Sequence, residues 1–238
     1  MGVIAGGICA FGILLVTTAG AVPVRETPAE LLKHRGMPLA FATIALGVVA
    51  LLAVPVRREP ERHLVSSDTL RRRWMAVALW VGLIYLTLPI GFQVVSAIVK
   101  TIGHSTFRRA VNALGALVAL GCVGALLWRR TPLRAYVVFA GLVLVYTYYF
   151  AALEVTVKRI HFLEYSFLSV LAERALRPFT PPPHLYLWVV LLALWVGTVE
   201  EWIAVFLPRR YGALSDVVFD VAAGTLGALF VKFVLRAG

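Results

Sequence analysis

Two stretches decide the fold: residues 110–128, AVNALGALVALGCVGALLW, and residues 135–153, AYVVFAGLVLVYTYYFAAL. Each is 19 residues long and contains no Asp, Glu, Lys or Arg. A helix of this length, rising about 1.5 Å per residue, crosses a hydrocarbon core of about 30 Å. Soluble folds do not require repeated uncharged runs of this length, so the sequence predicts a polytopic membrane protein.

The composition of the whole chain agrees with this prediction. Of 238 residues, 61% are apolar and 15% are charged, whereas a soluble domain is about half apolar and about a quarter charged. Charges and prolines bound eight hydrophobic segments, at about 2–22, 37–56, 74–98, 110–128, 135–153, 159–176, 185–207 and 215–235. We therefore expect an all-α fold, a polytopic transmembrane helix bundle of about eight segments.

A basic stretch at residues 57–73 separates the first two segments from the others. It contains six arginines around a short polar centre. We expect three parts: a two-helix membrane extension at 1–56, the basic loop at 57–73 and a transmembrane unit at 74–238.

The net charge of +11 is compatible with nucleic acid or with a membrane surface. The basic residues lie mostly between the apolar runs, so we expect them to contact anionic lipid headgroups and expect no nucleic acid. Other membrane proteins of a larger complex are the second expected class of partner. Alternate loops differ slightly in Lys and Arg content, which favours both termini on the cytoplasmic side.

Acidic residues gather in the last three hydrophobic segments. Six of the twelve lie there: Glu164, Glu173, Glu200, Glu201, Asp216 and Asp220. Ionisable side chains at membrane depth are costly and persist where they face a bundle interior and find partners. These segments are therefore the expected location of a functional site.

Helical spacing and topology predict that several of these side chains form one layer. His161, Glu164 and Tyr165 follow the i, i+3, i+4 spacing of one helix face. If the sixth segment crosses the membrane, its start, the end of the seventh and the start of the eighth meet at one membrane face, whereas Glu173 lies at the other. The predicted polar layer is Lys158, His161, Glu164, Tyr165, Glu201, Arg210, Asp216 and Asp220.

The polar layer has a catalytic and a structural interpretation. Glu201 and Asp216 could form a buried acid–base pair. We favour a structural network in which Asp216 caps the eighth helix and Glu201 pairs with Arg210 or Lys158. No HExxH-like motif is present and no second histidine lies near His161 in the sequence, so neither a metal nor a cofactor is expected. No residue is assigned a catalytic role.

Three ordered blocks within about 155–230 resemble the motifs of the VanZ-like family: VKRIHFLEYSFLSVL, GTVEEWIAVFLPRR and LSDVVFDVAAGTLG. The family pattern is a basic residue before His-Phe and a nearby Tyr, an acidic-Glu pair before a Pro-Arg turn, and an Asp before a Gly-rich helix. The matching positions are Lys158, His161, Glu164, Tyr165, Glu201, Pro208, Arg210, Asp216 and Gly224. Two positions depart from the pattern, since Ala204 replaces a usual Gln and Asp220 replaces a usual Asn.

The resemblance implies a bacterial cell-envelope protein of the cytoplasmic membrane, in a family associated with resistance to glycopeptide antibiotics. No reaction is established for the family. We therefore expect a non-enzymatic protein with a polar interfacial pocket that binds a lipid headgroup, an envelope precursor or a partner. The alternatives are an accessory subunit of a larger membrane complex and a membrane-embedded enzyme acting on a lipid- or phosphate-linked substrate.

Overall fold

The computed structural model describes residues 37–53, 66–153, 155–181, 184–208 and 212–236. These residues form helices and no strand: α3 (Met37–Ala53), α4 (Ser67–Ile102), α5 (His104–Trp128), α6 (Leu133–Ala152), α7 (Thr156–Leu176), α8 (His184–Val205) and α9 (Leu214–Phe230), which a π-helical turn continues over Val231–Leu235. The all-α class is as predicted.

Five of these helices are long and apolar enough to cross a membrane: α4, α5, α6, α8, and α9 with its π-helical continuation. The predicted count of about eight membrane segments is therefore not confirmed. The first predicted segment, 2–22, lies outside the described residues. The sixth coincides with α7, which carries too many charged side chains to be counted among the five.

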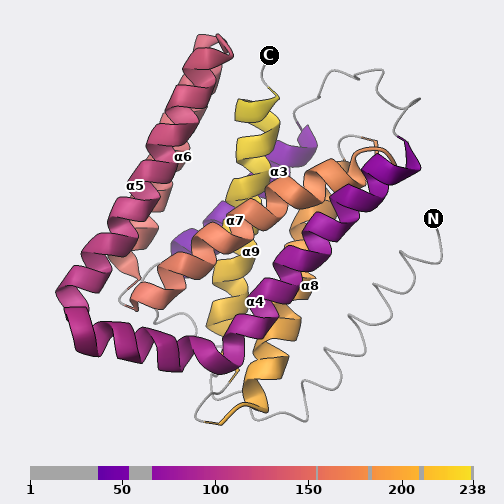
Figure 1. Ribbon diagram of the computed structural model, residues 1–238. Helices are drawn as coiled ribbons and strands as arrows, with labels where there is room; N and C mark the ends of the chain where they lie inside the picture. The colour runs from indigo at the N-terminus through magenta and orange to yellow at the C-terminus, as the bar shows by residue number, and fades with distance from the viewer. Residues whose placement is uncertain (1–36, 54–65, 154, 182–183, 209–211, 237–238) are drawn as a thin grey trace.

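The ends of α4 follow from its sequence. The Ser66 hydroxyl accepts a hydrogen bond from the Thr69 backbone N–H at 3.3 Å, which caps the first turn. At the other end Gly103 adopts a positive φ of 81°, a conformation that favours glycine. Pro89 interrupts the helical hydrogen bonding within α4, and the second half of α4 turns away from the first (Figure 1).

Close packing of α9 against α7 and α8 forms the centre of the bundle. A Cβ atom added to Gly224 would lie 2.5 Å from the Ala193 Cβ on α8. One added to Gly227 would lie 2.6 Å from the Ser166 carbonyl oxygen on α7. Small residues thus allow the three helices to approach closely, and this approach brings their polar side chains together.

α3 packs against the same central helix. The Lys232 ammonium donates to the Leu51 carbonyl at 2.6 Å and to the Ala50 carbonyl at 3.3 Å. These carbonyls lie in the last turn of α3, where helical partners are missing. The described part of the 1–56 extension is thus packed on the bundle, while the division of the chain at 57–73 stays a prediction.

Helices α5 and α6 form a hairpin at the edge of the bundle (Figure 1). Their outward faces expose large apolar side chains, including Leu117, Leu120, Val137 and Leu144. Such a surface is unsuited to water and suited to lipid. The described helices are therefore consistent with an integral, multi-pass membrane protein.

Candidate functional site

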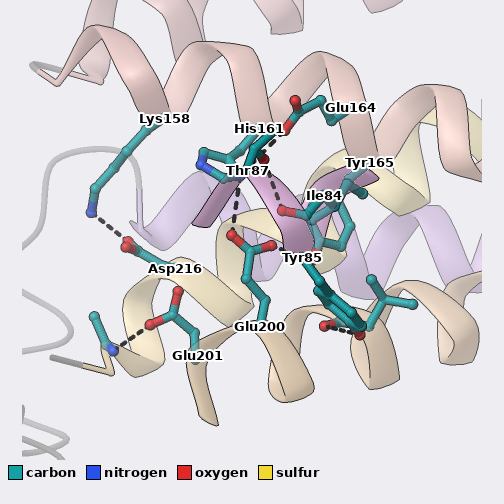
Figure 2. A network of polar contacts seen from close by, with 12 residues as sticks. Ile84, Tyr85, Thr87, Lys158, His161, Glu164, Tyr165, Glu200, Glu201 and Asp216 are labelled. Carbon is teal, nitrogen blue, oxygen red and sulfur yellow. Dashed lines mark hydrogen bonds and ion pairs between the residues drawn. The ribbon is translucent and has the colours of Figure 1, made fainter. Parts of the chain in front are cut away.

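The start of α7, the end of α8 and the start of α9 lie together at one end of the bundle (Figure 1), and Figure 2 shows their polar side chains from close by. Helix α7 contributes Lys158, His161, Glu164 and Tyr165. Helix α8 contributes Glu201, and α9 contributes Asp216 and Asp220. The eighth predicted member of the polar layer, Arg210, lies outside the described residues.

His161 lies between two carboxylates. Its Nδ1 atom is 3.4 Å from Glu164 Oε2 and 3.3 Å from Glu200 Oε1, and Figure 2 shows the imidazole between these two side chains. The His161 side chain is 24% exposed, whereas that of Glu200 is 4% exposed. The imidazole therefore connects the accessible side of the cluster with a buried acid.

Glu200 is the central carboxylate of this cluster, and it is absent from the predicted polar layer. The Tyr165 hydroxyl donates to its Oε2 atom at 2.8 Å, and Tyr165 is itself fully buried. The sequence contains a signal for this position, since Ala193, Gly197 and Ala204 mark a small-residue face of α8 that includes residue 200. All four residues of that face are buried or closely packed.

Glu201 faces a different neighbour. Its Oε2 atom accepts a hydrogen bond at 2.7 Å from the backbone N–H of Ala213, the residue before α9. Ala213 occupies the capping position of α9 and has no side-chain cap of its own, so Glu201 fixes the start of α9 from the neighbouring helix. Of its two expected partners, Lys158 is paired with another acid, Asp216, and Arg210 lies outside the described residues, so the expected pairing of Glu201 stays a prediction.

Lys158 forms its ion pair with Asp216 in the first turn of α9. Both side chains are about one third exposed. The expectation that Asp216 caps α9 is incorrect, because Ala213 occupies the capping position and Asp216 lies within the first turn. A carboxylate in the first turn still complements the helix dipole, and here it also attaches α9 to the start of α7.

Asp220 lies one turn further into α9 and is 5% exposed. Its carboxylate faces α8 at Gly197, where an added Cβ would lie 3.0 Å from Asp220 Oδ2 and 3.5 Å from the Tyr165 hydroxyl. Within the described parts of the chain, no residue forms a hydrogen bond or ion pair with this carboxylate. Asp220 is thus a buried acid beside the Tyr165–Glu200 hydrogen bond.

Helix α4 packs beside the polar layer and is hydrogen-bonded to both α7 and α8. The Trp80 indole N–H donates to the Glu164 backbone carbonyl at 3.1 Å, and the Tyr85 hydroxyl donates to the Val196 carbonyl at 3.1 Å. These contacts join α4 to α7 and to α8 next to His161 and Glu200. They restrict the relative movement of the two helices that provide the central side chains.

No metal site is found among the described residues, where no three His, Cys, Asp or Glu side chains are arranged to hold an ion. The polar layer as described contains five carboxylates, Glu164, Glu200, Glu201, Asp216 and Asp220, beside Lys158 and His161. Acceptors are therefore in excess of cations in this part of the structure.

A second polar cluster lies at the other end of α7, as expected for Glu173. The Arg177 Nε atom donates to Glu173 Oε1 at 2.7 Å, and Arg236 Nη2 lies 3.6 Å from Glu173 Oε2. The Glu173 side chain is 2% exposed. This carboxylate has two cationic neighbours, whereas no ion pair of Asp220 is found among the described residues.

In comparisons with known proteins, no family model, curated protein or solved structure matches the chain. The resemblance to the VanZ-like family therefore stays a prediction that depends on the three motif blocks.

Proposed function

We propose that this chain is a multi-pass protein of the bacterial cytoplasmic membrane, resembling the VanZ-like family, that binds the head group of a lipid or of an envelope precursor. Binding takes place at the polar layer and involves no chemical change of the ligand. The observation that supports this most directly is the partly exposed His161 between Glu164 and the buried Glu200.

The chemistry of the polar layer suits recognition of a polar group at the membrane boundary. Carboxylates accept hydrogen bonds, and an imidazole can donate or accept them. The cluster lies where α8 ends and α9 begins, and the ends of helices that span a bilayer lie near its polar headgroups. A head group can therefore reach His161 while its acyl chains lie along the apolar helix faces.

The contacts of Glu201 and Asp216 support binding over catalysis. A general acid–base pair needs carboxyl groups that can reach a substrate. Glu201 instead accepts the Ala213 N–H, and Asp216 is paired with Lys158. Both carboxylates thus have structural contacts that an acid–base role would have to break.

The test is lipid retention by the full chain purified in mild detergent. Native mass spectrometry would compare the wild type with Glu200→Gln and with a matched control, Glu173→Gln, which alters a buried glutamate at the other end of α7. We expect Glu200→Gln to lose a specifically retained lipid that the control keeps. Equal lipid retention in all three proteins would contradict the proposal.

The second candidate function is that of an accessory subunit in a larger membrane complex. The exposed apolar faces of α4, α5 and α6 favour it, because helices with little contact to their own bundle offer surface to another membrane protein. Proteins that co-purify with the chain at fixed stoichiometry would support this alternative. Co-purification that is unchanged in Glu200→Gln would separate it from head-group binding.

A further inference from the structure

Asp220 is the feature of the polar layer that the contacts above do not explain. Four acids of the same layer act on it electrostatically: Glu200, Asp216, Glu201 and Glu164. A buried carboxylate without a cationic or hydrogen-bonding partner destabilises a fold by several kcal/mol or must take up a proton. A side chain held in this position is therefore a candidate for ligand contact.

The other carboxylates of the layer already have partners. Asp216 has Lys158, Glu201 has the Ala213 N–H, and Glu200 has the Tyr165 hydroxyl together with His161. Even with His161 protonated, the described part of the layer holds two cations and five carboxylates. A positive charge that donates hydrogen bonds would balance the acids in this described part of the layer.

We propose, on the basis of the head-group function above, that the ligand carries a primary ammonium group, which the layer binds between Asp220 and Glu200. A primary ammonium has three N–H donors and a full positive charge. Asp220 and Glu200 offer oxygen acceptors on adjacent helices, and the Tyr165 hydroxyl donates to Glu200 and lies, like the Asp220 carboxylate, beside Gly197. The ammonium completes the hydrogen bonding of Asp220 and reduces the repulsion between the acids.

Entry is expected from the side of His161 and Glu164. Their side chains are 24% and 23% exposed, whereas those of Glu200 and Asp220 are almost fully buried. Exposure thus decreases from the edge of the layer to its base. An ammonium at the end of a short, flexible head group can follow this path while the rest of the ligand stays at the membrane boundary.

The geometry distinguishes a primary ammonium from two other cations. A divalent metal needs several ligands at short distance, and the described residues contain no such group of three. A quaternary ammonium has no N–H donor and is recognised by the faces of surrounding aromatic rings. The neighbours of Asp220 include the Glu200 carboxylate, the Tyr165 hydroxyl and Gly197, and the two oxygen groups suit a cation with N–H donors.

The primary ammonium can belong to a lipid head group or to a soluble amine. The first arm of the test therefore uses phosphatidylethanolamine and phosphatidylcholine with identical acyl chains, which differ in the methylation of the amine. The second arm uses ethanolamine in solution. Binding of the lipid alone identifies a lipid head group, whereas an equal effect of ethanolamine identifies a free amine, and both results support the ammonium.

Native mass spectrometry of the full chain measures lipid retention in wild type and in Asp220→Asn. A hydrogen bond to a charged group predicts a preference of about tenfold for phosphatidylethanolamine in wild type, lost in Asp220→Asn. Glu173→Gln serves as the matched control and should keep the preference. Equal retention of the two lipids by wild type, or an unchanged preference in Asp220→Asn, would refute the ammonium ligand.

Thermal melting separates ligand contact from a structural role. Without added lipid, Asp220→Asn should melt at a higher temperature than wild type, because it removes a buried charge that has no partner among the described residues. Phosphatidylethanolamine should raise the melting temperature of wild type and not that of the variant. A variant that melts lower than wild type and still responds to this lipid would assign Asp220 to the fold.

The same measurements distinguish failure of this inference from failure of the proposed function. Lipid retention that depends on Glu200 and is insensitive to amine methylation would leave the head-group function intact and refute the ammonium. Stabilisation by Mg²⁺ or Ca²⁺ that requires Asp220, without any effect of amines, would replace the ammonium with a metal. Retention that is independent of both acids would refute both proposals.

Discussion

Tyr165→Phe removes the hydroxyl that donates to Glu200 and keeps the aromatic ring, so it tests the hydrogen bond at the base of the polar layer. The two atoms are 2.8 Å apart, Tyr165 is fully buried and the Glu200 side chain is 4% exposed. A buried hydrogen bond to a charged acceptor contributes about 2 kcal/mol. For a chain of this length that loss lowers the melting temperature by about 4–8 °C.

The measurement is thermal unfolding of the full chain in detergent, followed by tryptophan fluorescence. Tyr148→Phe is the matched control, because Tyr148 is half-exposed on α6 and should melt like wild type. In a Glu200→Gln background the same Tyr165→Phe change should cost about half as much, since a bond to a neutral amide is weaker by about 1 kcal/mol. An equal loss in both backgrounds, or a loss below about 1 °C in wild type, would show that the hydroxyl and the carboxylate are not coupled.

Three further predictions test the rest of the bundle. Arg177→Leu leaves the buried Glu173 carboxylate with one cationic neighbour fewer and should cost about 3 kcal/mol of stability. Adding Glu173→Gln should restore part of this loss in detergent melts. Two losses that simply add would show that Arg177 and Glu173 are not coupled. Lys158→Ala removes a partly exposed ion pair and should cost less than about 1 kcal/mol, with the difference from wild type shrinking at high salt. In a cysteine-free background, Leu214→Cys should react with an impermeant thiol reagent in intact cells and Leu133→Cys only after permeabilisation; the opposite pattern would reverse the predicted orientation.

The helices were predictable because hydrophobic length is a strong signal, but their ends were not. The predicted segment 74–98 lies well inside α4, which spans Ser67–Ile102. A hydropathy pattern no longer indicates a helix where charged residues begin, although the helical backbone hydrogen bonding continues past them. The ends of α4 are indicated instead by its capping residues, since Ser66 caps the first turn and Gly103 ends the last.

The polar layer was predictable from topology, whereas the choice between its two adjacent glutamates was not. Residues 200 and 201 are separated by about 100° around a helix, so only one of them can face Tyr165. Two adjacent acids in a sequence do not indicate which of them faces the interior of the bundle. The face is set by the neighbours that allow close packing, and on α8 these are Ala193, Gly197 and Ala204.

The same packing explains how a group of acids can persist at the end of an apolar bundle. Gly224 and Gly227 bring α9 against α8 and α7 closely enough that rearrangement around one carboxylate would disturb many apolar contacts. The apolar packing of the three helices therefore offsets the electrostatic cost of keeping Asp220 beside Glu200. Among the described residues Asp220 has no partner, whereas the acids around it are paired or hydrogen-bonded. Proteins show such exceptions most often at functional sites. A sequence optimised only for stability would place Asn or Ala at 220, so the acid itself is a second argument, beside the position of His161, that this end of the bundle binds a ligand.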